Sequence, residues 1–282
     1  MTRAMNSQKW ALFLKINLGV FVLIVLQGCN SSQKQDREHL VFKYNEHSNI
    51  ATLDPAFARN PQTIWPSNQL FNGLVQLDDQ LNIQPDIAKS WRINDSTSTY
   101  TFTLRDDVYF HKNKVFKKDS TRSVVAQDFV YSFDRLLSPE LASPGSWVFN
   151  AVQRYHAAND STLVIQLNKP FPAFLGLLSM RYCSVVPKEA IAYYGNDFRS
   201  NPVGTGPFRF KFWEENVKLV LRKNPMYFEK DTQGNRLPYL EAVAITFLPD
   251  KQSEFLQFAQ GNIDFMTGLD NSYKDEIITT KG

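Results

Sequence analysis

The chain has 282 residues, 43% of them hydrophobic and 13% aromatic, which is enough to build one or two buried cores. It carries 31 basic and 28 acidic side chains, and the first 28 residues hold three basic residues and no acidic one. The remaining 254 residues therefore carry 28 charges of each sign. This balance gives no case for binding to nucleic acid or to an anionic membrane surface.

Residues 1–28 are typical of a secretory signal, because basic residues flank or interrupt an apolar run that ends at Leu26. The uninterrupted part, residues 18–26, is shorter than the ~20 residues of a membrane-spanning helix, so a plain transmembrane anchor is the weaker interpretation. The run ends in Leu26-Gln27-Gly28-Cys29, which resembles a bacterial lipobox. The resemblance implies cleavage before Cys29, followed by acylation, including palmitate, of its thiol and new amino group.

A polar segment follows the lipobox. Residues 30–38 contain no apolar side chain, and we interpret 29–39 as a flexible tether. Asn30, directly after Cys29, does not resemble an inner-membrane retention signal. With Cys29 lipidated, Cys183 is the one cysteine left in the mature chain, so no intrachain disulfide is expected.

Strands dominate the expected elements up to residue 110. A strand over 40–44 is followed by an extended segment, 49–52, which Leu53-Asp54-Pro55 ends. A helix over 62–71, with Gly73 as its end, precedes a hairpin of 74–77 and 81–83. A helical turn is expected within 85–91. Strict alternation over 100–104 predicts a half-buried strand, which 108–110 continue.

Helices and strands alternate in the rest of the chain. Helical spacing of apolar residues over 126–137 predicts an amphipathic helix that Ser138-Pro139 ends. Further strands are expected over 163–167, 208–212, 218–221 and 243–248, and a helix over 251–259. The apolar stretch 170–180 is too short to cross a bilayer. The pattern predicts a mixed α+β chain of the α/β class.

No pattern indicates catalysis. The four histidines, His39, His47, His111 and His156, sit singly and lack the spacing of a zinc site. Nucleophile elbows, zinc-protease motifs and Walker loops do not occur in the sequence. Gly204-Thr205-Gly206-Pro207 lacks the third glycine of a dinucleotide loop and is interpreted as a tight turn. We expect no enzyme activity, no metal and no cofactor.

Two kinds of charged run remain. The acidic pairs Asp78-Asp79, Asp106-Asp107 and Glu214-Glu215 fall between predicted strands and are interpreted as turn residues rather than acid–base pairs. The basic run comprises Lys112, Lys114, Lys117, Lys118 and Arg122. We interpret it as a solvated loop rather than a contact for an anion or partner, because charge runs are usually exposed.

Seven stretches of the chain occur in an order that resembles one family, the extracytoplasmic solute-binding proteins of peptide-type ABC importers (oligopeptide- and dipeptide-binding lipoproteins, bacterial family 5). The similarity covers the chain from about residue 40 to its end. The stretches are Leu53-Asp54-Pro55-Ala56, Leu70-Phe71-Asn72-Gly73-Leu74, residues 83–91, 100–111 and 126–133, Asn201 to Phe208, and Gly261-Asn262-Ile263-Asp264.

This resemblance implies one lobe of a type II periplasmic-binding-protein-like fold, with an inserted smaller subdomain and the second lobe missing. Residues 40–57 and 168–262 correspond to a sheet subdomain, 58–167 to the inserted subdomain, and 263–282 to the start of a truncated second lobe. In the family, an extended peptide pairs with a strand just before the Leu-Asp-Pro motif, which corresponds to Asn49, Ile50 and Ala51. An ordinary edge strand is the alternative for these residues.

The resemblance also marks Trp147, which follows a Ser-Pro motif, as a ring that contacts ligand; a core tryptophan is the alternative. The acidic residue that binds the peptide amino group in the family has no counterpart here.

The implied function is a lipid-anchored, monomeric protein of the cell envelope, on the periplasmic or extracellular face. It captures oligopeptides or dipeptides for the membrane subunits of an ABC importer and binds no nucleic acid. The alternative is a truncated remnant, or a surface lipoprotein that binds a partner, because a lone lobe cannot enclose a ligand. The solute class stays open among peptides, nickel chelates and sugars.

Overall fold

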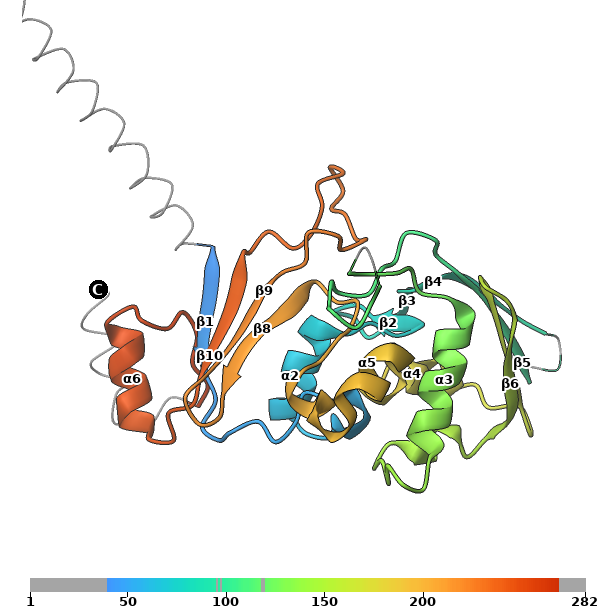
Figure 1. The fold of residues 1–282 in the computed structure, drawn as a ribbon, viewed down its shortest axis with the longest axis horizontal. Helices are drawn as coiled ribbons and strands as arrows, with labels where there is room; N and C mark the ends of the chain where they lie inside the picture. The colour runs from blue at the N-terminus through green and yellow to red at the C-terminus, as the bar shows by residue number, and fades with distance from the viewer. Residues whose placement is uncertain (1–39, 95, 97, 118–119, 269–282) are drawn as a thin grey trace, which may run out of the picture.

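The structure, a computed structural model, describes residues 40–268 except 95, 97, 118 and 119, so residues 1–39 and 269–282 lie outside it. The described chain is elongated (Figure 1). Helix α6 (Lys251–Ala259) lies at one end, followed by a four-stranded sheet, the central helices and a second four-stranded sheet at the other end. Within this part of the chain, no helix is long and apolar enough to span a bilayer.

Sheet A joins distant parts of the sequence. Its order is β1 (Val41–Asn45), β10 (Ala242–Thr246), β9 (Lys218–Lys223) and β8 (Phe208–Glu214). β1 runs parallel to β10, with Val41 opposite Ala242, and the other pairs are antiparallel. The first four residues of β10 are all buried, as expected for a strand covered on both faces.

Sheet C is built from one continuous part of the chain. Its order is β4 (Ala88–Ile93), β5 (Thr99–Leu104), β7 (Thr162–Leu167) and β6 (Val152–Asn159), and all pairs are antiparallel. β5 and β7 alternate between buried and half-buried residues, which confirms the predicted strands over 100–104 and 163–167. The amphipathic helix predicted over 126–137 is α3 (Ala126–Leu137), which packs on β6 and β7. β2 (Val75–Leu77) and β3 (Ile83–Pro85) form the predicted hairpin.

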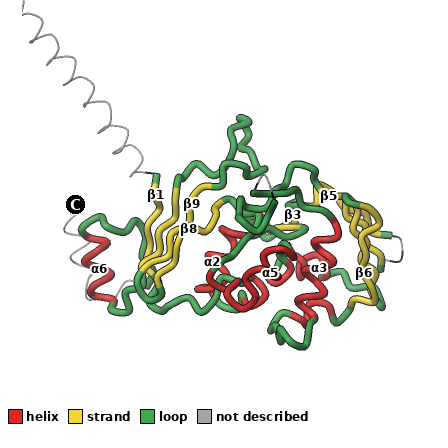
Figure 2. Tube along the Cα trace, in the orientation of Figure 1, coloured by secondary structure: helices red, strands yellow, loops and turns green. Residues whose placement is uncertain are grey.

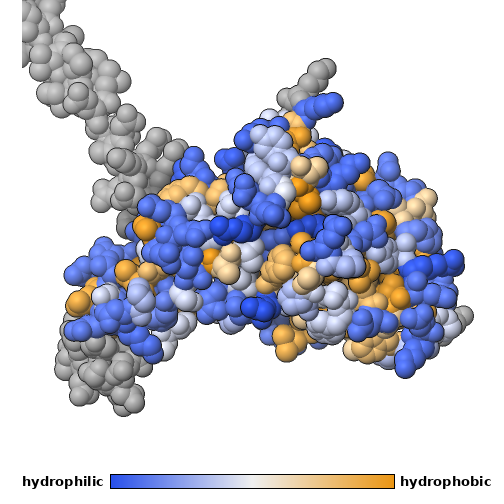
Figure 3. Space-filling view, turned by 60° about the horizontal axis from the view of Figure 1, so that its bottom comes forward, coloured by the Kyte–Doolittle hydropathy of each residue, from blue (hydrophilic) through white to orange (hydrophobic). Residues whose placement is uncertain are grey.

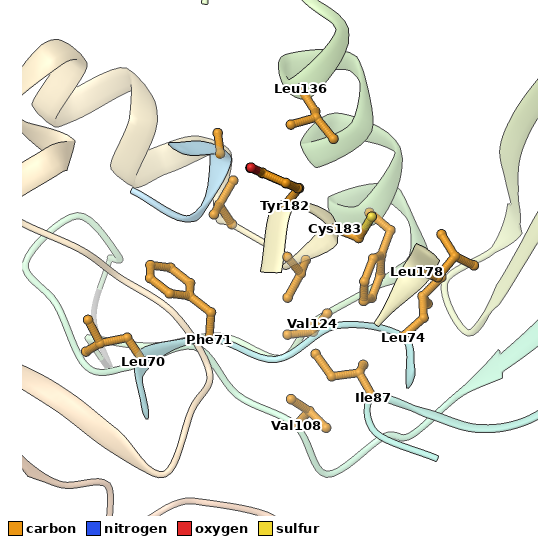
Figure 4. Close-up of a cluster of buried hydrophobic side chains, with 14 of the residues drawn as sticks. Leu70, Phe71, Leu74, Ile87, Val108, Val124, Leu136, Leu178, Tyr182 and Cys183 are labelled. Carbon is orange, nitrogen blue, oxygen red and sulfur yellow. The ribbon is translucent and has the colours of Figure 1, made fainter. Parts of the chain in front are cut away.

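Short helices fill the space between the two sheets (Figure 2). They are η1 (Pro55–Phe57), α2 (Pro61–Leu70), η2 (Ser146–Phe149), α4 (Phe174–Leu178), η3 (Arg181–Cys183), α5 (Lys188–Tyr194) and η4 (Gly195–Ser200). Figure 4 shows Leu70 of α2, Leu136 of α3, Leu178 of α4 and Cys183 of η3 in one cluster of buried hydrophobic side chains. On the face drawn in Figure 3, hydrophilic side chains dominate and hydrophobic ones form small patches.

Three local predictions are wrong. The helical turn expected within 85–91 is the end of β3 and most of β4. α2 ends at Leu70 with Phe71 as its cap, and Gly73 does not adopt the left-handed backbone that ends a helix. Residues 108–110 do not continue β5, because Tyr109 instead forms an isolated bridge to Ser123.

The glycines of the Gly204–Pro207 turn serve close packing rather than backbone freedom. Neither Gly204 nor Gly206 has a positive φ. A Cβ on Gly206 would lie 2.5 Å from the Gln69 carbonyl oxygen, and one on Gly204 would overlap the Leu70 carbonyl. The glycines therefore let this turn lie directly against the end of α2.

The strands of sheet A come from residues 41–45 and 208–246, and those of sheet C from residues 88–167. Subdomain boundaries near residues 57 and 167 stay a prediction.

Candidate functional site

Helix α2 is the element around which the larger hollows of the described surface lie. Its start is fixed by a capping box, in which Asn60 Oδ1 accepts from Thr63 N at 3.1 Å and Thr63 Oγ1 accepts from Asn60 N at 3.3 Å. The buried face of the helix holds Ser67 and Leu70. The residues at 65, 68 and 69 share the opposite face, since positions i, i+3 and i+4 line one side of a helix.

An apolar hollow of about 290 Å³ lies between this face of α2 and sheet A. Trp65 and Phe265 are 41% and 44% exposed, so two large rings stand open to solvent there. The Tyr44 and Trp65 ring centroids are 6.4 Å apart, as are those of Phe42 and Phe265. These aromatic walls would accept an apolar side chain of a ligand.

A second hollow of about 560 Å³, with a mixed lining that is more polar than that of the first, adjoins the apolar one, because Gln69 lines both. Asn68, Gln69, Gln76, Ser179 and Arg181 contribute polar groups to its lining. Within the described chain, the side-chain amides of Asn68 and Gln69 have no hydrogen-bond partner, so their donors and acceptors are open to a ligand. We call the two adjoining hollows the α2 groove.

A buried hydrogen-bond network holds the polar half of the α2 groove in place. Asn72 Nδ2 donates to Asp86 Oδ1 at 2.9 Å, and Gly73 N donates to Asp86 Oδ2 at 3.0 Å. Asn72 Oδ1 accepts from Thr205 Oγ1 at 3.0 Å. Burial raises the pKa of Asp86 to about 7, and the charge of Arg181 opposes this shift. The network joins three chain segments and gives the groove a fixed wall.

The predicted ligand residues Asn49, Ile50 and Ala51 lie on the other side of α2. They belong to no helix or strand. Ile50 is fully buried, while Ala51 is exposed and lines a separate hollow of about 580 Å³ together with Arg59, Asn60 and other residues. Ala51 O accepts from Arg199 Nη1 at 3.4 Å. The Ile50 side chain is therefore closed to a ligand, and the role of this segment stays a prediction.

The other predicted residues are not brought to this segment. Trp147 lies in η2 with 46% of its surface exposed, so it is no core residue, and it lines none of the three hollows around α2. Its contact with ligand stays a prediction. Cys29 lies outside the described residues. Cys183 is buried, and burial raises its pKa to about 12, which leaves the thiol protonated.

The basic run is not one solvated loop. Lys112 and Lys117 are exposed as expected, but Arg122 is half-buried and donates to both Asp128 and Glu189 at 2.7 and 2.8 Å. The ammonium of Lys114 lies 5.0 Å from the centre of the Tyr193 ring. Lys118 lies outside the described residues.

The α2 groove escaped the sequence analysis, although part of its signal was present. Trp65, Asn68 and Gln69 follow helical spacing, and an aromatic ring beside two amides on one face of a helix is unusual for a face turned to the core. Most other residues of the apolar hollow come from β1, β8, β10 and the segment at Phe265, and those of the second hollow include residues of β2 and η3; only the folded chain brings these segments together.

Residues 82–282 match the bacterial extracellular solute-binding proteins, family 5 (middle region). Because this match covers more than half of the chain, the chain belongs to that family. Its described part has the mixed α/β architecture of type II periplasmic binding proteins.

The names of individual relatives mention different ligands. The chain is 29% identical to a probable deoxycholate-binding periplasmic protein of Escherichia coli, over 79% of this chain and 43% of that one. It is 31% identical to the periplasmic oligopeptide-binding protein of Salmonella typhimurium, over 74% and 40% of the two chains. The structure resembles a periplasmic binding protein of Helicobacter pylori in complex with the peptide STSA, with a TM-score of 0.75 and 27% identity, covering 85% and 48%. The chain thus spans less than half the length of these relatives.

Proposed function

We propose that the protein captures peptides outside the cytoplasm and delivers them to an ABC importer, and that the α2 groove contacts the peptide. The observation that carries this proposal is the junction of two unlike hollows at Gln69. A peptide needs partners for its backbone amides and a surface for its apolar side chains. The unpaired amides of Asn68 and Gln69 supply the first, and the Trp65–Phe265 walls supply the second.

The position of the α2 groove supports the same role. Phe265 lines the groove and lies three residues before Gly268, where the described chain ends. The matched part of the chain covers less than half of each relative, so a further part of a family member would join the described part beside this groove. A peptide bound there would lie between two bodies of protein, which desolvates its backbone hydrogen bonds.

Calorimetric titration of the mature protein with pools of tri- to pentapeptides tests the proposal. Trp65→Ala should weaken binding about tenfold, since a desolvated aromatic contact contributes about 1.5 kcal/mol. Trp147→Ala tests the other predicted ligand contact in parallel, because that ring has similar exposure but lines no hollow around α2. Absence of binding heat with every pool would overturn the peptide assignment. A loss confined to Trp147→Ala would move the site to η2.

The same titration tests the predicted backbone role of Asn49, Ile50 and Ala51. Ala51→Pro removes an N–H and fixes φ. If a peptide pairs with this segment, affinity should fall about tenfold while the melting temperature of the free protein stays nearly unchanged. Unchanged affinity would rule out strand pairing at Ala51, and an unfolded variant would show that the N–H serves the fold.

We infer in addition that lipid on Cys29 anchors the protein. The support is the Leu26-Gln27-Gly28-Cys29 sequence. Intact-mass measurement of membrane-extracted protein should find acyl chains that Cys29→Ala lacks. Cys183→Ala is the matched control, because that thiol is buried and should leave the added mass unchanged. A mature protein without acyl mass would overturn the inference.

A further inference from the structure

A small hollow of about 130 Å³ lies beside β8 and the end of α5, and it shares no lining residue with the α2 groove. The loop after β5 contributes Lys112 and Asn113, the end of α5 contributes Tyr194, and β8 contributes Arg209. Asn201 closes it on one side. The volume suits a single small group rather than a peptide.

The charge of this hollow is unbalanced. Lys112 and Arg209 both line it, and no aspartate or glutamate does. Within the described chain, neither cation takes part in an ion pair, in contrast to Arg122, whose two carboxylate partners neutralise it. Lys112 therefore differs in its surroundings from Arg122 of the same basic run.

Hydrogen bonding leaves one further donor open in the lining, the side-chain amide of Asn113. The Asn113 Oδ1 atom already accepts from Val115 N and Tyr194 Oη, both at 3.2 Å, which leaves its NH₂ group unengaged. His111 cannot compete for a ligand. Its Nδ1 accepts from Gly204 N at 3.3 Å, and its Nε2 lies 3.0 Å from Gly206 O, a carbonyl that can only accept. The ring is therefore neutral, with its proton on Nε2.

We propose that this hollow, between Lys112, Asn113 and Arg209, binds a phosphate-type oxyanion, either free phosphate or the headgroup of a phospholipid. Two cations and an amide NH₂ supply donors for a doubly charged group, and charge-assisted hydrogen bonds to such groups are among the strongest in proteins. Arginine suits the fork of two phosphate oxygens, while lysine adds a point charge. The site is distinct from the proposed peptide site, so each can fail without the other.

Thermal unfolding of the protein in a chloride buffer, with inorganic phosphate raised from about 0.1 to 10 mM, tests the site through the stabilisation that a bound ligand confers. We expect a saturable rise in melting temperature. In the double variant Lys112→Gln/Arg209→Gln the apparent Kd should rise at least about tenfold, because hydrogen bonds to a charged ligand contribute about 1.5–3 kcal/mol each. The matched control is Lys89→Gln/Arg92→Gln, which removes an exposed lysine and arginine from β4 and should bind phosphate like the wild type.

Sedimentation with vesicles of phosphatidylglycerol and phosphatidylcholine distinguishes the two sources of phosphate. The Cys29→Ala background is used so that no acyl chain contributes. Vesicle binding that the Lys112→Gln/Arg209→Gln variant loses would assign a headgroup, and phosphate binding without vesicle binding would assign the free anion. Absence of both, or an equal loss in the Lys89→Gln/Arg92→Gln control, would overturn the proposal.

Discussion

Sheet C and sheet A solve the same packing problem with different sequence patterns. In sheet C, one face of β5 and β7 is buried, and alternate residues of each strand are apolar. In sheet A, β10 lies between β1 and β9 and is buried at four successive positions, so its sequence does not alternate. Sheet C arises within residues 88–167, whereas β1 pairs with a strand about 200 residues later. All four strands of sheet A were expected from the sequence, whereas only the two inner strands of sheet C were, so local pairing did not make a sheet easier to predict.

The largest expected effect compares one core residue from each sheet. Ile245 in β10 and Ile165 in β7 are both fully buried. Each change to alanine should lower the free energy of unfolding by about 3–4 kcal/mol, through lost burial and the cavity left behind. Urea unfolding measures these losses.

Amide hydrogen exchange then sharpens the comparison. Ile245→Ala should speed exchange in β1 and β9, and Ile165→Ala in β5 and β6, because each change weakens the sheet that contains it. The same exchange pattern in both variants would show that the two sheets open as one unit.

A smaller effect is expected where the Gly204–Pro207 turn lies against the end of α2. Gly204→Ala places a Cβ against the Leu70 carbonyl, which is backbone and can give little, so stability should fall by about 2–3 kcal/mol. Gly176→Ala in α4 is the control, because no atom lies within 4 Å of the added Cβ. That variant should change stability by less than about 1 kcal/mol, in the stabilising direction. Equal losses in both variants would contradict the packing role of Gly204.

The smallest effect depends on pH. Burial lowers the pKa of His111 from an ordinary value near 6.5 to about 4, and the hydrogen bond to Gly206 opposes this shift. As pH falls below 6.5, the unfolded chain takes up this proton before the folded one. The contribution of His111 to the free energy of unfolding is therefore fully present above about pH 7 and is lost toward pH 4.

Between pH 7 and pH 5 the titration of His111 should lower the free energy of unfolding by about 2 kcal/mol. His111→Gln should remove that part of the pH dependence, measured as the difference between urea curves at the two pH values. His156→Gln, which alters an exposed ring on β6, should behave like the wild type. An unchanged pH dependence in His111→Gln would contradict the assignment.

The sequence predicted the inner strands of sheet C and failed at its edges. β5 and β7 were predicted, but β4 was expected to be helical and β6 was not predicted. Most residues of β4 and β6 are exposed or half-buried, with lysine, arginine, glutamine and alanine among them, so neither strand alternates clearly. Pairing with β5 and β7 decides their conformation, and local propensity does not contain this information.

The candidate site was predicted less well than the fold. The role of Asn49, Ile50 and Ala51 in contacting a ligand stays a prediction, and the Ile50 side chain is buried in the core, which no sequence pattern indicated. The α2 groove depends on Phe42, Trp65, Phe208 and Phe265 meeting, and these come from four separate segments. The spacing of residues along α2 could indicate only the residues that this helix contributes to the groove.

The parallel pairing of β1 with β10 also constrains the order in which the chain can fold during its synthesis. β1 leaves the ribosome early, but its partner follows only after about 200 more residues. At ~5–20 residues per second, β1 waits about 10–40 s without its neighbour. All the strands of sheet C emerge within that interval, so the locally paired region can fold first and sheet A closes last.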